Sequence, residues 1–160
     1  MSRLDSFIRR LEAQRACLDW ACAIVADVPG VVLELGLGNG RTYDHLRERL
    51  GAAREIYAFD RRLDAHPSCV PPANRLLLGE LRRALPRFDR RPVALAHADL
   101  GSGDAEASAA LARWLGPALA PLMAPGGVVL SDQPLADPRL LPAALPAGVP
   151  DGRYFIYRRA

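Results

Sequence analysis

A glycine-rich turn is the feature of this sequence best suited to bind a small ligand. The stretch Glu34–Gly40 (ELGLGNG) follows an apolar segment, residues 31–35, and precedes a helix expected over residues 41–50. Its three alternating glycines lack a Cβ atom, so they allow a sharp turn and expose N–H groups at the N-terminus of a helix. Such a turn is typical of a site for a nucleoside-type cofactor, in which Glu34 would accept a hydrogen bond from an amine.

A second acidic residue, Asp60, follows the apolar run 56–59 and lies 24 residues after Gly36. This position predicts the tip of the neighbouring parallel strand, where a carboxylate can accept from both hydroxyls of a ribose. The dinucleotide-binding fingerprint requires a third glycine at the position where this chain has Arg41. The spacing therefore differs from that fingerprint.

An acidic residue, a GxGxG turn and then Asp60, in this order, resemble the class I S-adenosylmethionine-dependent methyltransferases over residues 31–130. The resemblance implies S-adenosyl-L-methionine as cofactor, with its amine and carboxylate at Glu34 and the turn, and its ribose at Asp60. In this family an acidic residue after the third strand often reaches the adenine amino group, and Glu80 occupies that place. The cofactor-binding residues implied by the resemblance are Glu34, Gly36, Gly38, Asn39, Gly40, Thr42, Asp60, Arg61, Glu80 and Asp99.

Asp99 follows the apolar run 93–98, at the place where the family has a residue facing the methyl group and the substrate. Methyl transfer is an in-line displacement at a sulfonium, so it needs a nucleophile held near the methyl carbon and, for a protonated acceptor, a base. We predict that Asp99 is this base. His97 is the second catalytic candidate, and its alternative role is that of a hydrogen-bonded strand histidine that faces a covering helix.

The pair Asp132 and Gln133 follows a fifth apolar run, residues 126–130, and resembles the oxygen ligands of magnesium-dependent catechol-type O-methyltransferases. Gln133 stands where those enzymes have Asn. All 21 basic residues are arginine, so the lysine base of some of those enzymes is also missing. We therefore predict no metal site, and we interpret Asp99 and Asp132 as solvated carboxylates at strand ends.

Length and hydrophobic content favour one α/β domain over residues 1–160. The chain has 160 residues, of which 50% are hydrophobic, enough for a single core. Alternating helices and strands predict a Rossmann-like fold, with a mostly parallel sheet and helices on both faces. Residues 1–28 are expected to form an amphipathic helix. One final strand at 154–157, where the family usually has a pair, predicts trimmed C-terminal strands.

The charge distribution does not favour a nucleic-acid partner. Five arginines lie within residues 82–91, directly before the fourth strand, so we expect them at the edge of the sheet opposite the ligand. No apolar run approaches the roughly 18 residues that span a bilayer, and the first residues lack the apolar block of a signal peptide. We expect a cytoplasmic protein without a membrane partner, and a homodimer that completes the pocket.

The sequence thus predicts a methyltransferase that acts on a small-molecule substrate. One alternative is a nicotinamide-dependent oxidoreductase, for which Arg61 and Arg62 would suit a 2'-phosphate. Another is a non-catalytic partner subunit that binds S-adenosylmethionine, because the chain has little substrate-binding apparatus.

Overall fold

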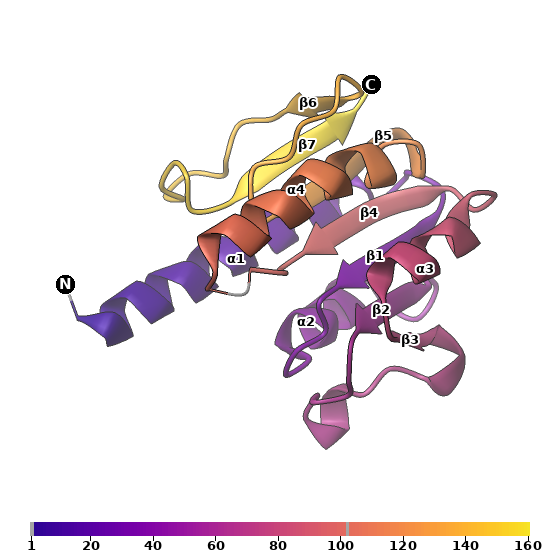
Figure 1. The fold of residues 1–160 in the computed structure, drawn as a ribbon, viewed down its shortest axis with the longest axis horizontal. Helices are drawn as coiled ribbons and strands as arrows, with labels where there is room; N and C mark the ends of the chain where they lie inside the picture. The colour runs from indigo at the N-terminus through magenta and orange to yellow at the C-terminus, as the bar shows by residue number, and fades with distance from the viewer. Residues whose placement is uncertain (1, 102) are drawn as a thin grey trace.

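The protein, seen in a computed structural model that describes residues 2–101 and 103–160, is built on one seven-stranded sheet (Figure 1). The strand order is β3-β2-β1-β4-β5-β7-β6. The first five strands in this order run parallel, and β7 is antiparallel to both β5 and β6. The strands are β1 (Val31–Leu35), β2 (Ile56–Asp60), β3 (Leu76–Leu78), β4 (Val93–Ala98), β5 (Met123–Ser131), β6 (Leu140–Pro142) and β7 (Phe155–Arg159). The predicted mostly parallel α/β fold is confirmed.

Helices cover both faces of the sheet, and each face has its own apolar core (Figure 1). On one face α1 and α2 pack against the sheet through side chains such as Leu18 and Leu46. On the other face α4 and the segment around α3 contribute Leu115 and Phe88. The helices are α1 (Arg3–Ile24), α2 (Arg41–Leu50), α3 (Leu81–Ala84) and α4 (Ala105–Leu119), and short 3-10 turns lie at Pro67–Cys69, Ala73–Arg75 and Leu85–Phe88.

Helix α1 is shorter than the 28 residues expected from the sequence. It starts with a capping box between Ser2 and Asp5 and ends at Ile24. Its second half is buried against the sheet, whereas Phe7 and Ile8 in the first half are 46% and 44% exposed. Figure 1 shows this first half extending beyond the sheet. No helix of the described residues is long and apolar enough to cross a membrane.

The expectation of a single final strand is wrong. The segment Leu140–Pro142 pairs with β7 as a second, three-residue strand at the edge of the sheet. A strand this short shows too little alternation of polar and apolar residues to be recognised, and its proline suits an edge position. The C-terminal part of the sheet is thus short but carries the usual pair.

Parallel pairing brings the predicted site residues to one edge of the sheet. Leu35, the last residue of β1, pairs with Phe59 on one side and with Ala98 on the other. The glycine turn, Asp60 and Asp99 follow these three residues directly, so they meet where the strands end.

Candidate functional site

A cavity of about 730 Å³ lies at the carboxyl edge of the sheet. Its walls are the first half of α1, the glycine turn, the ends of β2, β3 and β4, and one side of α4. The volume is in the range of about 300–1,000 Å³ that is usual for small-molecule sites. Nine of the predicted cofactor residues line it, and these are Gly36, Gly38, Asn39, Gly40, Thr42, Asp60, Arg61, Glu80 and Asp99.

The glycine turn fits a ligand that approaches the backbone closely. All three glycines have positive φ angles, which side-chain-bearing residues rarely adopt. A Cβ atom on Gly36 would lie 2.5 Å from the carbonyl oxygen of Asp99, and one on Gly40 would lie 2.6 Å from the Cβ of Cys69. Gly38, in contrast, has no atom within 4 Å of that position. The turn is therefore closely packed against the protein at Gly36 and Gly40 and open at Gly38, which leaves room for a cofactor.

Asp60 is held at the cavity by two backbone donors. The N–H of Gly38 donates to Oδ2 at 2.8 Å, and the N–H of Arg61 donates to Oδ1 at 2.7 Å. A carboxylate oxygen accepts more than one hydrogen bond, so both oxygens keep capacity for ribose hydroxyls. The geometry is that expected for the predicted ribose acceptor.

Glu34 does not reach the cavity. The residue is fully buried, its Oε2 lies 2.7 Å from Nδ1 of His97, and its Oε1 accepts from the hydroxyl of Thr42. No part of the residue is exposed, so neither carboxylate oxygen can be reached from the cavity. The predicted direct contact with the methionine amine does not fit this arrangement, and Thr42 is the member of the pair that lines the cavity.

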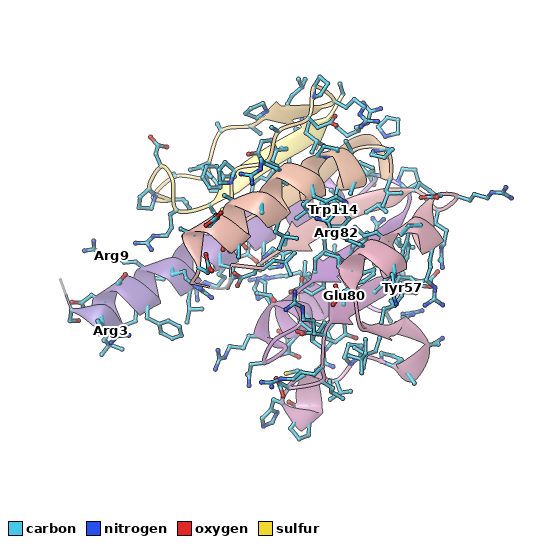
Figure 2. The ribbon with its side chains drawn as sticks, in the orientation of Figure 1. Arg3, Arg9, Tyr57, Glu80, Arg82 and Trp114 are labelled. Atoms are coloured by element: carbon cyan, nitrogen blue, oxygen red, sulfur yellow. The ribbon has the colours of Figure 1, made fainter. Side chains whose placement is uncertain are left out.

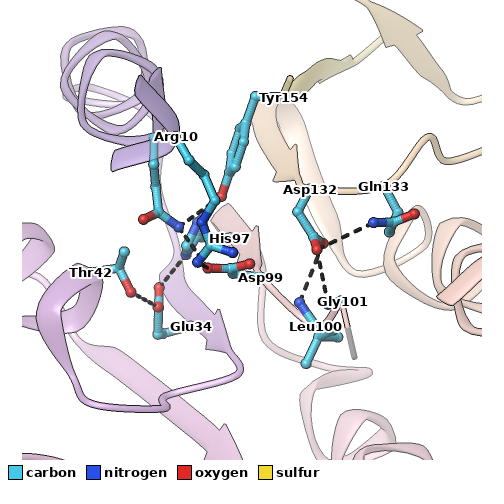
Figure 3. Close-up of polar contacts among 11 residues, drawn as sticks. Arg10, Glu34, Thr42, His97, Asp99, Leu100, Gly101, Asp132, Gln133 and Tyr154 are labelled. Carbon is cyan, nitrogen blue, oxygen red and sulfur yellow. Dashed lines mark hydrogen bonds and ion pairs between the residues drawn. The ribbon is translucent and has the colours of Figure 1, made fainter. Parts of the chain in front are cut away.

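His97 is also fully buried, between Glu34 and the hydroxyl of Tyr154 (Figure 3). Burial lowers the pKa of His97, whereas the carboxylate of Glu34 raises it, and the resulting pKa lies above the ordinary value. Because neither ring nitrogen faces the cavity, the structure favours the alternative role of a hydrogen-bonded strand histidine. It does not fit the predicted role of a base that touches the substrate.

Asp99 does line the cavity, and α1 supplies its partners. Arg10 Nη2 lies 3.2 Å and Gln14 Nε2 lies 2.9 Å from its Oδ2. Sequence reasoning missed both partners, as well as Tyr154, which accepts from Gln14 at 3.3 Å. The available signal was the polar Gln14 within the apolar stripe of α1.

Asp132 supports the loop after β4 instead of facing the cavity. Its oxygens accept from the N–H groups of Leu100 and Gly101 at 3.3 and 2.9 Å, and Gln133 Nε2 lies 3.4 Å away (Figure 3). Burial, and then the neighbouring Asp99, raises the pKa of Asp132. Across residues 2–101 and 103–160, no group of three or more His, Cys, Asp or Glu side chains is placed to hold a metal ion.

The expectation that the whole arginine cluster lies at the edge of the sheet opposite the ligand is wrong for Arg82. Helix α3 starts right after Glu80, at the carboxyl end of β3, so Arg82 lines the cavity. Its guanidinium lies 4.2 Å from the ring centroid of Trp114, on α4 (Figure 2). Arg91, at the other end of the cluster, pairs with Glu55 and lies outside the cavity lining.

Comparisons with known proteins agree with the fold. Residues 1–159 match the model of a family described as S-adenosyl-L-methionine methyltransferase. A crystal structure of an S-adenosyl-L-methionine methyl transferase from Silicibacter pomeroyi DSS-3 is 45% identical, with a TM-score of 0.93 over 100% of this chain and 99% of that one. The comparison with curated proteins gave no match.

More distant structures share the fold. Human methyltransferase-like protein 13 in complex with SAH is 14% identical, with a TM-score of 0.56 over 94% of this chain and 80% of that one. Cofactor-bound Rv0187 from MTB is 16% identical, with a TM-score of 0.59 over 97% and 89%.

The fold and the site define a Rossmann-like methyltransferase that uses S-adenosyl-L-methionine as cofactor. The chain belongs to the S-adenosyl-L-methionine methyltransferase family that its sequence matches over 1–159. The predicted family, enzyme class and cofactor are confirmed, and the nicotinamide-dependent alternative is not supported.

Proposed function

We propose that the enzyme transfers the methyl group to a small-molecule acceptor bound between α1 and the end of β4, with Asp99 as the base. The observation that carries this proposal is the position of Asp99 in the cavity wall, beside the glycine turn, in a cavity that Phe7 and Leu11 of α1 also line. The cavity volume of about 730 Å³ supports an acceptor of small-molecule size.

Different residues along the cavity would bind the cofactor and take part in methyl transfer. The bound cofactor supplies an electrophilic methyl group on a sulfonium. The turn around Gly38 and the carboxylate of Asp60 would hold the cofactor, and Glu80 would accept a hydrogen bond from its adenine amino group. Asp99 would take the proton that the acceptor loses as its lone pair attacks the methyl carbon. Arg10 and Gln14 keep that carboxylate in place.

We also propose a cytoplasmic homodimer with neither a nucleic-acid nor a membrane partner. Leu4, Phe7 and Ile8 are exposed apolar side chains at one end of α1, and Phe7 also lines the cavity, so a second copy that covered them would also close the acceptor side. Light scattering on the purified protein measures the mass in solution, and a monomer would contradict the dimer.

Titration calorimetry followed by an acceptor screen tests the function. We expect binding of S-adenosyl-L-methionine and its demethylated product, with no comparable binding of NAD(H) or NADP(H). Methyl transfer to a small molecule should then be detected with a labelled methyl group. Cofactor binding without transfer to any acceptor would favour a non-catalytic partner subunit instead.

Asp99→Asn separates the base from a metal ligand. The amide keeps the shape but cannot take a proton, so cofactor binding should persist while transfer to a protonated acceptor falls by about 10²–10⁴-fold. EDTA should leave the rate unchanged. Activity lost in EDTA and restored by magnesium would favour the metal site, and full activity in Asp99→Asn would remove this residue from the mechanism.

A further inference from the structure

A chain of hydrogen-bonded side chains runs beneath the cavity from Asp99 to Thr42 (Figure 3). It begins at Gln14, whose Nε2 lies 2.9 Å from Oδ2 of Asp99 and 3.3 Å from the hydroxyl of Tyr154. The Tyr154 hydroxyl contacts Nε2 of His97. The chain continues from Nδ1 of His97 to Glu34 at 2.7 Å and ends at the hydroxyl of Thr42.

The donors and acceptors of this chain fit together in one direction. The charged oxygen of Asp99 requires a donor, so the NH₂ group of Gln14 must face it. The second hydrogen of this group points to the oxygen of Tyr154. The hydroxyl of Tyr154 then donates to Nε2 of His97, because this nitrogen is its remaining partner.

The donor role of the Tyr154 hydroxyl also determines which nitrogen of His97 carries the proton. A neutral ring that accepts at Nε2 carries its hydrogen on Nδ1, which donates to Glu34. Burial raises the pKa of Tyr154 well above its usual value, and Asp99 adds to this effect, so the hydroxyl keeps the hydrogen that it donates. With the opposite tautomer, Nε2–H would face Tyr154 and leave the buried hydroxyl hydrogen without an acceptor.

We propose that Gln14 and Tyr154 are positioning residues for Asp99, anchored on a His97 ring that carries its proton on Nδ1. This inference rests on the proposed role of Asp99 as the base. Gln14 lies on α1, the helix that forms the acceptor wall, so the chain also fixes this wall against the sheet. It thereby connects the acceptor side of the cavity with Thr42 on the cofactor side.

Nitrogen NMR of the histidine rings tests the direction of the chain without an acceptor. Substitutions His45→Gln and His66→Gln remove the two other histidine signals and leave His97 intact. The pH is raised until the nitrogen signals stop moving, because the pKa of His97 lies above the usual histidine value and the tautomer is defined only for the neutral ring. The neutral ring should then show a protonated Nδ1 and an unprotonated Nε2. A proton on Nε2 would overturn the assigned direction.

Gln14→Leu tests whether the side chains act as a unit. Gln14 does not contact the His97 ring, yet its loss frees the Tyr154 hydroxyl to turn, so both nitrogen signals of His97 should shift toward a mixture of tautomers. Cys17→Ala, about one turn further along α1 and also buried, is the matched control and should leave the signals unchanged. Unchanged signals in Gln14→Leu would overturn the inference.

Kinetics test the positioning role once an acceptor is found. Gln14→Leu and Tyr154→Phe should lower kcat by up to about 100-fold, the scale expected when a catalytic group is misplaced by about 1 Å. Cofactor affinity should stay within about twofold. If Asp99→Asn is fully active, the proposed base fails whatever the NMR result; if only Asp99→Asn loses activity, the base stands and the positioning role falls.

Discussion

At the scale of single residues, the difference between Glu34 and Asp60 shows what a position in the sequence leaves open. Both acids were expected to contact the cofactor. Each oxygen of both acids has one hydrogen-bond partner, but Glu34 is fully buried and outside the cavity lining, whereas Asp60 lines the cavity. The exposure of the carboxylate to the cavity therefore decides which acid can bind a ligand.

Asp60→Ala should therefore weaken cofactor binding by about 1–3 kcal/mol, because it removes a charged acceptor from the ribose hydroxyls. Titration calorimetry measures the loss. Asp64→Ala, which removes an exposed acid from the loop that follows β2, is the control and should bind normally. Unchanged affinity in a folded Asp60→Ala protein would place the ribose elsewhere.

Residues at strand ends could be predicted from the sequence, whereas contacts between distant segments could not. Asp60 and Asp99 each follow a short apolar run, and parallel pairing brings such positions to one edge. The contact of Gln14 with Tyr154 joins residues 140 positions apart and depends on how α1 crosses the sheet. A pattern of residue types carries no information on that crossing.

At the scale of elements, α3 and α4 meet across the cavity near Glu80. The guanidinium of Arg82 stacks on Trp114 at 4.2 Å, and both side chains line the cavity wall. Helix α3 has only four residues, too few for a helical pattern that would predict Arg82 at the ligand edge. The proposed adenine position at Glu80 lies beside this pair.

Cofactor binding should consequently change the fluorescence of Trp114. The chain has two tryptophans, and Trp20 lies outside the cavity lining, so Trp114→Phe should abolish most of the response and Trp20→Phe should preserve it. Arg82→Ala, which removes the guanidinium that stacks on Trp114, should alter this fluorescence response without abolishing it. A response that survives in Trp114→Phe would place the adenine away from α4.

In the molecule as a whole, one sheet contains both the strands that end at the cavity and a C-terminal hairpin, β6 and β7, whose strands do not line the cavity. Strands β6 and β7 extend the sheet beyond β5, and the cavity lies over the parallel part. Tyr154, just before β7, is the link between the two, because its hydroxyl meets His97 under the cavity. The hairpin thus supports the site through packing and one buried hydroxyl.

The turn before β6 contains a carboxyl group, Asp137, whose contribution to the stability of the fold depends on pH. Asp137 accepts three hydrogen bonds from the backbone and guanidinium of Arg139, which lower its pKa from 3.8 to about 2. A carboxyl whose pKa is lower in the folded state stabilises the fold above its unfolded pKa, and this contribution disappears as the pH falls through the folded value. The relevant window is therefore between pH 3.8 and about 2.

Asp137→Asn should destabilise the protein at neutral pH by about 1 kcal/mol or less, because the Arg139 side chain is 41% exposed and solvent screens its charge. For a chain of this size the loss corresponds to a Tm lower by about 2–4 °C. Thermal unfolding followed by circular dichroism should show this difference at pH 7 and its disappearance near pH 2. The exposed Asp151→Asn is the control and should match the unsubstituted protein at both pH values. A difference between Asp137→Asn and the unsubstituted protein that persists unchanged near pH 2 would show that the effect comes from packing in the turn and not from the charge of Asp137.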